Sequence, residues 1–593
     1  MKLLSLFFGV ALAATLRRDD TCNPADRTYS NEVPRAGKYQ PWGLIPFEKI
    51  GFPATQYVTI VNLTPHRFVL DKSRTHSYQM DVFDWDDIPQ GRSRQNIAAY
   101  TSKAGKNGVD DNGEVYYKID GTNQGFQVRK TNHIPDDYPR RTIFDLSNMN
   151  LGQREYLDPG KESSVTLVIT GSAQYGFQAS LRHPRANWMK SIYNVIKDRK
   201  VKHLYMPGTH DSGMSRISGK INSIGSSSNT QTQGVNFYDQ LRTGARLFDL
   251  RVGSIHKNDN TADYSYWTLH VNNERGDVAI GNSGESLDDV INEVNHFLAE
   301  NPGEIVFFRV RYMIGIRETP MGGPIFWDAK QVNDFFGQLK RVNNRCGNLD
   351  TNTKFNEQPA KYFMDQNGGN GCVLFLLDQG NFQGNVPHDS VADGIYKSDV
   401  MDVWDNWSDM DNTEKVANDQ VADWKTVHRG GDNDRFLISQ WLVSANAITT
   451  TALTIQNIAI QPTNPALYWM GINNMSPESY PTVSLIDYIG VVVEDRHDFD
   501  SLSAEMFTLA VGMNLYMASE NCAVAKGKSP LLKAAPKAKT LAAEPSWNGI
   551  IFANSTTVDD AKGQRIGRVS VLKSGTRFLN GTVVGGDTRN SCP

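Results

Sequence analysis

Strands and helices alternate along the chain from about residue 187 to residue 520, and this alternation is the feature that most limits its fold. Short apolar runs typical of buried strands are separated by segments with apolar residues three and four positions apart, which are typical of amphipathic helices. The predicted strands are Leu247–Arg251, Ile305–Val310, Val373–Leu377, Phe436–Ile438, Leu467–Met470 and Val483–Ile489. Such alternation predicts an α/β fold with a parallel sheet, closed into a distorted (β/α)8 TIM-type barrel.

Two predicted helices separate these strands most clearly. Ser286 and Asp289 have the spacing of a helix-starting capping box, and an apolar stripe follows as far as Glu300. Asn301-Pro302-Gly303 then ends this helix. The second helix carries its apolar stripe at Val332, Phe335, Phe336, Leu339 and Val342.

Residues from about 22 to 185 have a different character. They contain short alternating or β-branched runs and no long segment of helical periodicity, which predicts an all-β, sandwich-like domain. The predicted strands include Tyr57–Leu63, Val115–Lys118 and Val165–Ile169. Three aromatic residues of this region, Trp42, Phe83 and Trp85, suit either a binding face or a core, and we favour the core because large aromatic side chains are usually buried.

The first 13 residues have the pattern of a secretory signal peptide. Lys2 supplies the positive start, Leu3–Leu12 is an apolar run too short to span a membrane, and Ala11-Leu12-Ala13 fits the cleavage pattern. Arg17-Arg18 is a dibasic sequence that would release a propeptide at residues 14–21. The sequence therefore predicts a secreted, extracellular protein.

Glycosylation and disulfide bonds are expected in that compartment. Asn-x-Ser/Thr sequons predict solvent-facing positions, some of them glycosylated, at Asn62, Asn406, Asn474, Asn554 and Asn580. Of the five cysteines, Cys346 and Cys372 form the favoured pair, and Cys522 with Cys592 is a second candidate. Cys22 is then left over, and the pairing stays open because spacing alone does not fix connectivity.

The last part of the chain reads as a tether followed by a small β-like segment. Residues 523–546 are rich in Lys, Ala and Pro, which indicates a solvated linker and would also permit peripheral contact with an anionic membrane. Residues 547–593 form the β-like segment. The net charge of −4 gives no reason to expect a nucleic-acid partner.

One group of motifs carries the chemistry. Met206-Pro207-Gly208-Thr209-His210-Asp211-Ser212 is followed by Phe248-Asp249-Leu250-Arg251 and then by Trp267-Thr268-Leu269-His270. Two histidines, a fixed cation and orienting carboxylates are what acid–base cleavage of a phosphodiester requires. Asp249 and Arg251 lie two apart on a predicted strand, so their side chains point to one face.

These motifs, in this order, together with Gln240-Leu241, Gly244–Arg251 and the Glu300–Glu304 turn, resemble the catalytic X domain of phosphatidylinositol-specific phospholipase C. The resemblance is to the bacterial, metal-independent type and covers roughly residues 187–520, within a predicted catalytic domain at residues 187–522. It implies a barrel that cleaves a phosphoinositide or a related phosphodiester by way of a cyclic inositol phosphate.

The resemblance also implies roles for individual residues. His210 matches the general base that deprotonates the inositol 2-hydroxyl, and His270 matches the general acid that protonates the departing oxygen. Arg251 matches the phosphate-binding arginine. The supporting carboxylates correspond to Asp211, Asp249 and Asp487, and the last of these is expected to pair with the base.

Arg251 bears on metal use, because calcium-dependent relatives have a carboxylate at that position. A guanidinium supplies fixed positive charge instead, so we expect no catalytic metal and no cofactor. The substrate-reading side departs from the pattern. Arg311 stands where the family has a basic inositol contact, Asp378 follows a strand where an arginine is expected, and Gln440 lies near an expected carboxylate.

Three functions remain open on the sequence. The first is a secreted phospholipase C-like phosphodiesterase acting on inositol phospholipids. The second is the same barrel acting on another headgroup, such as a glycerophosphodiester. The third is an inactive barrel that carries a lipid- or glycan-binding β domain.

Overall fold

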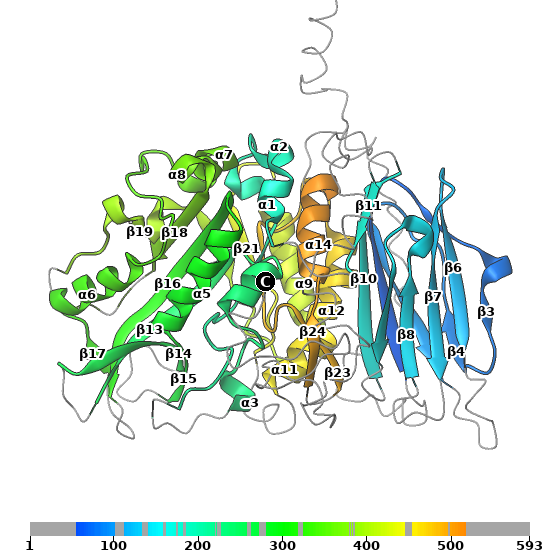
Figure 1. Cartoon of the computed structure of the whole chain (residues 1–593), viewed down its shortest axis with the longest axis horizontal. Coiled ribbons are helices and arrows are strands. Elements are labelled where there is room, and N and C mark those ends of the chain that lie inside the picture. The colour runs from blue at the N-terminus through cyan, green and yellow to red at the C-terminus, as the bar shows by residue number, and fades with distance from the viewer. Residues whose placement is uncertain are drawn as a thin grey trace, which may run out of the picture.

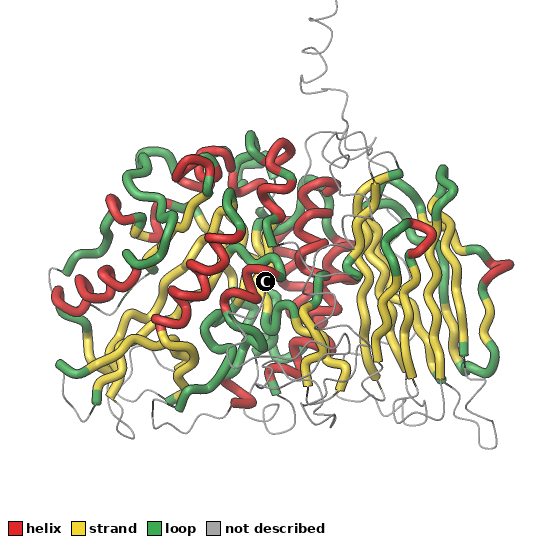
Figure 2. The backbone as a smooth tube through the Cα atoms, in the orientation of Figure 1, coloured by secondary structure: helices red, strands yellow, loops and turns green. Residues whose placement is uncertain are grey.

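A computed structural model describes residues 55–517, with the exception of 101–111, 133–139, 158–161, 174–175, 182–185, 220, 222–226, 258–261, 272–279, 318–323, 379, 381, 383–385, 428, 445–453 and 496–497. Two regions lie side by side: a strand-and-helix region and a region of strands alone (Figures 1 and 2). The predicted signal peptide, propeptide, tether, C-terminal segment, Cys22, Cys522, Cys592, Asn554 and Asn580 fall outside the described residues.

The strand-and-helix region is built on parallel strands. Within the described residues, eight of them form one continuous hydrogen-bonded order, β19-β18-β16-β13-β12-β22-β21-β20, and neighbours in that order run parallel. Their bounds are β12 (Met206–Thr209), β13 (Leu247–His256), β16 (Glu304–Arg317), β18 (Gly371–Leu377), β19 (Ile395–Lys397), β20 (Val403–Asn406), β21 (Phe436–Gln440) and β22 (Val483–Ile486). A TIM-like α/β fold is therefore confirmed, but β19 and β20 are the ends of the order and are not paired in the described residues, so closure of the barrel stays a prediction.

Three antiparallel strands extend this sheet beside β13 and β16. They are β14 (Tyr264–Val271), β15 (Gly281–Ser286) and β17 (Pro324–Phe326). A separate hairpin consists of β23 (Val491–Asp495) and β24 (Asp498–Leu502).

Helices connect and cover the barrel strands. The longest are α5 (Leu287–Glu300), α6 (Ala329–Leu339) and α9 (Thr413–Thr426), and the Ser286 side chain caps α5 by accepting from the Asp289 amide, as its sequence predicts. The others described here are α1 (Trp188–Ser191), α2 (Tyr193–Ile196), α3 (Ser227–Thr230), α4 (Phe237–Arg242), α7 (Ala360–Met364), α8 (Gln366–Gly369), α11 (Ile455–Ile458), α12 (Asn464–Ala466), α13 (Ile472–Asn474) and α14 (Glu505–Gly512).

One predicted strand is wrong. Leu467–Met470 lies in the π-helix η12 (Leu467–Gly471), which continues α12. Pro465 lies inside a continuous helical run from Ile455 to Asn474, directly after the π-helical turn η11 (Ala459–Thr463). A short apolar run without alternation does not distinguish a buried helix from a buried strand, and the prediction of a strand failed here for that reason.

The strand-only region contains two sheets. The first has the order β11-β10-β1-β5-β4 and the second β2-β6-β7-β8-β9, with β3 beside β6. The first comprises β1 (Thr55–Leu63), β4 (Val82–Asp84), β5 (Arg92–Ala99), β10 (Glu162–Ser172) and β11 (Gly176–Ala179). The second comprises β2 (Phe68–Leu70), β3 (His76–Ser77), β6 (Gly113–Ile119), β7 (Gly125–Asn132), β8 (Arg140–Asp145) and β9 (Gln153–Leu157).

Both sheets contribute to one apolar cluster. Val58 and Ile60 of β1 meet Val115 and Tyr117 of β6 in it. Trp85 is buried in this cluster and Phe83 packs against it, so the expected core role of these two aromatic residues is confirmed, whereas Trp42 lies outside the described residues. That residues 22–185 form a sandwich-like domain stays a prediction.

The five-stranded sheet is buried on its other face as well, because it packs against the barrel. Along β1, Val58 and Ile60 face the strand-only cluster, while Val61 and Leu63 belong to the barrel core. The helix α14 packs on β10, and a side chain added at Gly512 would lie 2.7 Å from Leu63 Cδ1. Figure 1 shows α14 between the barrel and this sheet.

Because the two regions share a core, we expect them to unfold as one unit. Leu63→Ala should lower the free energy of unfolding by about 2–5 kcal/mol, since it deletes a fully buried side chain. Scanning calorimetry should show one transition that shifts as a whole, whereas Tyr78→Ala, at an exposed position, should leave it in place. Two transitions, with only one of them moving in Leu63→Ala, would contradict this expectation.

Two predictions about modification have different outcomes. Cys346 and Cys372 are paired, with their Cα atoms 5.2 Å apart, as predicted. The prediction for Asn62 is wrong, because its side chain is fully buried and its amide donates to the carbonyls of His66 and Ile88. Asn406 and Asn474 are exposed, and their glycosylation stays a prediction.

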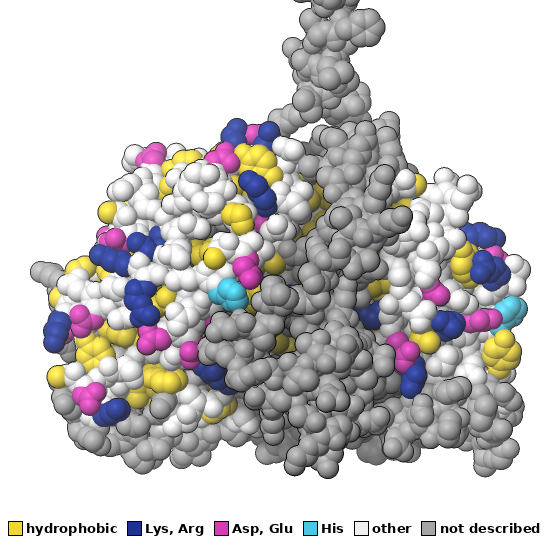
Figure 3. Space-filling model, in the orientation of Figure 1, with side chains coloured by type: hydrophobic (Ala, Val, Ile, Leu, Met, Phe, Trp, Pro, Cys, Tyr) yellow, Lys and Arg dark blue, Asp and Glu magenta, His cyan; other side chains and the backbone are white. Residues whose placement is uncertain are grey.

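The described surface mixes charges of both signs. On the face in Figure 3, basic and acidic side chains are interspersed over both regions without a large patch of one sign. Within the described residues, no helix is both long enough and apolar enough to cross a membrane.

Candidate active site

The candidate site lies at the carboxyl end of β12, where the chain turns sharply. His210 and Asp211 follow this strand, and the His210 amide donates to the Ile486 carbonyl of β22 at 3.1 Å. Asp211 has a φ of 41°, and Tyr488, which follows Asp487 just after the neighbouring strand β22, has a φ of 51°. Non-glycine residues rarely adopt this left-handed conformation, and such strain is typical of functional sites.

His210 is held on both ring nitrogens. Its Nδ1 lies 2.8 Å from Asp487 Oδ1, and its Nε2 lies 2.8 Å from Arg251 Nη2. A guanidinium can only donate, so Nε2 accepts from Arg251 and Nδ1 carries the proton that it donates to Asp487. In this tautomer Nε2 has the lone pair that a general base needs.

His270 has its own carboxylate. It stands near the end of β14, and its Nδ1 lies 2.9 Å from Oδ2 of the fully buried Asp211, although the two atoms are not aligned for a hydrogen bond. The ring centroids of His210 and His270 are 6.5 Å apart, with planes at 78°. Two imidazoles, each beside a different carboxylate, therefore face the same space.

Arg251 joins the two halves of the site. Its Nε lies 3.0 Å from Asp249 Oδ2, and its Nη1 lies 3.4 Å from Asp211 Oδ2 and 3.3 Å from the Tyr312 hydroxyl. Burial opposes ionisation, but Asp249 and Asp211 outweigh it and raise the pKa of Arg251. Burial would likewise raise the pKa of Asp249, and the charges of Arg251 and Arg311 lower it instead. The guanidinium is thus a fixed cation.

A second layer of charged residues, made of Arg309 and Arg311 of β16 with the carboxylates beside them, lies next to Asp249 and Arg251 because β13 and β16 are paired. Asp249 is opposite Arg309, and Arg251 is opposite Arg311. Arg311, predicted from the sequence to bind substrate, lies 3.7 Å from Asp249 Oδ1 through its Nη1. The structure therefore brings together every predicted site residue, namely His210, Asp211, Asp249, Arg251, His270, Arg311 and Asp487, while their catalytic roles stay predictions.

Sequence reasoning missed the partners of this second layer. Arg309 Nη2 lies 3.0 Å from Asp378 Oδ2, and Arg309 also bonds Asp405, whose other oxygen accepts from Gln440 Nε2 at 2.6 Å. Arg309 of β16 therefore lies beside Asp378, after β18, and Asp405 of β20 lies beside Gln440. The alternation of Arg309 and Arg311 on one strand is the signal that could have revealed the first of them.

A buried carboxyl pair supports the turn that follows Asp211. Glu285 of β15 is fully buried, its carboxylate accepts from the Ser215 hydroxyl, and its amide donates to the Gly213 carbonyl. Glu293 of α5 accepts from the Phe237 amide at 3.0 Å. Burial and the neighbouring Glu293 hold the pKa of Glu285 well above its usual range, and burial raises the pKa of Glu293 to about 7.

This pair predicts a loss of stability as the pH rises. The folded protein binds protons more tightly than the unfolded chain does, so the contribution is complete below pH ~4.5 and is lost as the pH passes through about 7. A shift of this size corresponds to roughly 3 kcal/mol. In thermal melts between pH 4.5 and 8, the melting temperature of Glu285→Gln should fall less steeply with rising pH than that of the parent chain. Glu414→Gln, at an exposed position, should keep the parent slope; an unchanged slope in Glu285→Gln would contradict the assignment.

Across the part of the chain that the structure describes, no group of three or more His, Cys, Asp or Glu residues is arranged to hold a metal ion.

Comparison with known proteins bears on the motifs. No protein-family model matches the chain. The chain is 26% identical over 162 residues to the human PI-PLC X domain-containing protein 2, which is 24% of this chain and 49% of that protein. It is 25% identical over 146 residues to a PI-PLC X-box domain-containing protein of Dictyostelium discoideum, which is 22% of this chain and 17% of that one. The chain thus spans about half or less of the length of these relatives.

Solved structures give a weaker likeness. A phosphatidylinositol-specific phospholipase C of Staphylococcus aureus aligns with a TM-score of 0.36 and 13% identity, over 55% of this chain and 97% of that one. The resemblance to PI-PLC X domains that the motifs predict is confirmed by the curated relatives.

Proposed function

We propose that this protein cleaves a phosphodiester by the acid–base chemistry of a phosphatidylinositol-specific phospholipase C. The observation that carries the proposal is the pair of imidazoles beside separate carboxylates, with one guanidinium between them. The curated relatives, which are named for a PI-PLC X domain, support the same class of reaction.

His210 acts as the general base. Its Nε2 accepts from Arg251 in the free protein, and a bound phosphate attracts the guanidinium and leaves this lone pair for the attacking hydroxyl. Asp487 fixes the ring through Nδ1 and stabilises the imidazolium that forms. His270, beside Asp211, protonates the departing oxygen.

Arg251 holds the phosphate during the reaction. Asp249 and Asp211 keep the guanidinium charged and fixed in direction, so its donors are in place before charge develops on the phosphoryl oxygens. Bidentate contact with phosphate is the geometry that a guanidinium favours.

The second layer of charge supports a polyhydroxylated headgroup. Arg309 and Arg311 lie beside Asp378, Asp405 and Asp249, so this side offers both donors and acceptors in compensated pairs. Such pairs suit the hydroxyls of an unphosphorylated inositol ring. They also suit glycerol hydroxyls, so cleavage of a glycerophosphodiester is the second candidate.

The decisive experiment identifies the products. Phosphorus NMR at early times on phosphatidylinositol should show a cyclic inositol phosphate before any monoester, because the nucleophile belongs to the substrate and attack is intramolecular. EDTA should leave the rate unchanged, since Arg251 supplies the cation. Monoester appearing first would contradict the mechanism. Cleavage of glycerophosphodiesters alone would rule out inositol as the headgroup. Activity that depends on calcium would contradict the expectation that no metal is needed.

We also propose that the enzyme is secreted and meets its substrate at a membrane surface by peripheral contact. The signal-peptide pattern of residues 1–13 supports the first point. A lipid substrate requires the second.

A further inference from the structure

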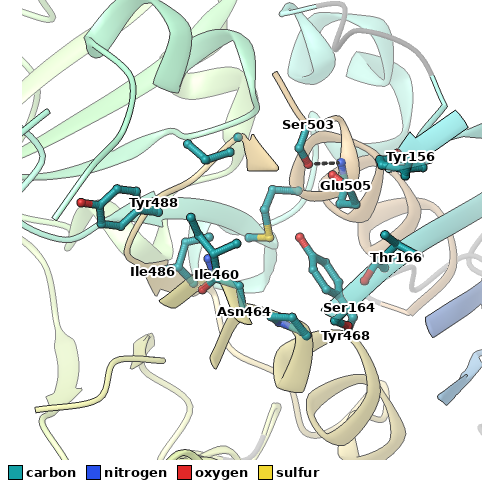
Figure 4. A pocket seen from close by; sticks show the side chains of 15 residues that line it. Tyr156, Ser164, Thr166, Ile460, Asn464, Tyr468, Ile486, Tyr488, Ser503 and Glu505 are labelled. Atoms are coloured by element: carbon teal, nitrogen blue, oxygen red, sulfur yellow. Dashed lines mark hydrogen bonds between the residues drawn. The ribbon is translucent and has the colours of Figure 1, made fainter. Parts of the chain in front are cut away.

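A cavity lies where the strand-only region meets the barrel, and Ile486 and Tyr488, on either side of Asp487, are among the residues that line it. It has a volume of about 60 Å³ and is bounded by β10, α12, η12, β22 and α14 (Figure 4). None of the predicted catalytic residues lines it. A volume of this size holds roughly four to six water-sized groups.

Buried polar atoms in its wall lack partners. Within the described residues, Glu505 Oε2, Asn464 Oδ1 and Ser164 Oγ have no hydrogen-bond partner. Glu505 is only 4% exposed. Buried polar atoms are nearly always hydrogen-bonded, so whatever fills the cavity, water or a solute, has to offer hydrogen-bonding groups to these three atoms.

The opposite wall is apolar. Ile460 and Ile486 lie across the cavity from the carboxylate of Glu505, and Met506 also lines it (Figure 4). Water can hydrogen-bond to the polar wall but makes no favourable contact with the apolar wall. A molecule with hydroxyls on one edge and a C–H surface on the other fits both.

Charge excludes the simplest ionic occupants. Burial raises the pKa of Glu505 to about 7, against the nearby charge of Arg154 and the side chain of Tyr156, so at neutral pH this carboxyl is partly protonated and both donates and accepts. Arg154 repels a cation from this wall, and an anion would still face the ionised fraction of Glu505. Asn464 Oδ1 can only accept, whereas the Ser164 hydroxyl donates or accepts. Neutral hydroxyl groups meet all of these demands.

We propose that this cavity binds a small neutral polyol, of about the size of glycerol, through Glu505, Asn464 and Ser164. The site is independent of the proposed phosphodiesterase. It adjoins the backbone that carries the catalytic base's partner, because Asn464 Nδ2 donates to the Asp487 carbonyl at 2.8 Å.

Methyl NMR on the full chain tests this site without using activity. Met506 labelled with ¹³C at its methyl group, and assigned through Met506→Leu, reports on the cavity. Glycerol should shift this resonance saturably, and 1-propanol, which keeps the carbon chain but has one hydroxyl, should bind at least about tenfold more weakly. Thermal shift is unsuitable, because polyols stabilise proteins generally by exclusion from their surface.

Variants and further probes complete the test. Glu505→Gln and Ser164→Ala should each weaken glycerol binding by about tenfold, with circular dichroism confirming the fold. Thr166→Val, at a neighbouring hydroxyl without an orphaned atom, should weaken it less. No saturable shift with glycerol would show that the cavity holds water alone. Equal binding of 1-propanol, or tighter binding of ethanolamine, would also overturn the proposal.

Discussion

Replacing His210 or His270 with alanine should lower kcat by about 10²–10⁴ in each case while leaving the fold intact. Both side chains are partly exposed, with 18% and 23% of their surfaces accessible, so their removal opens no large internal cavity. Hydrolysis of a soluble phosphodiester, measured beside thermal melts, separates lost catalysis from lost stability.

The control and the double variant sharpen this test. His296→Ala, on α5 and 46% exposed, should keep the parent kcat. The double variant His210→Ala/His270→Ala should be little slower than the worse single variant, because residues that act as a unit have non-additive effects. Near-parent turnover in either single variant would reject that residue's role.

A variant at Asp487 tests the role of His210 more specifically. Asp487→Asn keeps the shape of the Nδ1 partner but removes the charge that stabilises the imidazolium. It should lower kcat and leave KM nearly unchanged, because the loss is felt mainly in the transition state. A rise in KM alone would show that Asp487 only positions substrate.

A single sequence predicts contacts between residues that are close along the chain better than contacts between residues on different strands. The pairing of Asp249 and Arg251 on one face follows from the two-residue period of a strand, and it is visible in the motif. The pairing of Asp249 with Arg309 depends on the register between β13 and β16, and a single sequence carries no direct signal of register. That difference is why Arg311 was identified by resemblance and Arg309 was missed.

The errors in fold have the same origin. Leu467–Met470 is apolar and short, so its local pattern fits a strand, and only packing against the strand-only sheet explains the helix. Asn62 satisfies the local sequon rule but lies at the end of a strand that is buried on both faces. Strand–helix alternation, by contrast, repeats over the whole barrel, and such a repeated signal tolerates one wrong element.

Arg251→Lys should be nearly as damaging as loss of a histidine, although the charge is kept. Arg251 donates through Nε to Asp249 at 3.0 Å, through Nη2 to His210 at 2.8 Å, and lies 3.4 Å from Asp211 through Nη1. A lysine ammonium is a point charge without the planar fork, so it cannot hold these partners and a phosphate in fixed directions. Losing one preorganised donor to the developing charge typically costs about 10²–10³ in kcat.

A matched pair elsewhere controls for the chemistry of the exchange. Arg435 also bonds a carboxylate, that of Asp402 at 2.7 Å, but it precedes β21 and so lies at the opposite end of the parallel strands from His210. Arg435→Lys should therefore leave kcat unchanged. If Arg251→Lys retains the parent kcat and changes only KM, the guanidinium binds the phosphate equally in ground and transition states. If it retains both kcat and KM, Arg251 does not bind the phosphate, and the phosphate site would be assigned to Arg311 or Arg309.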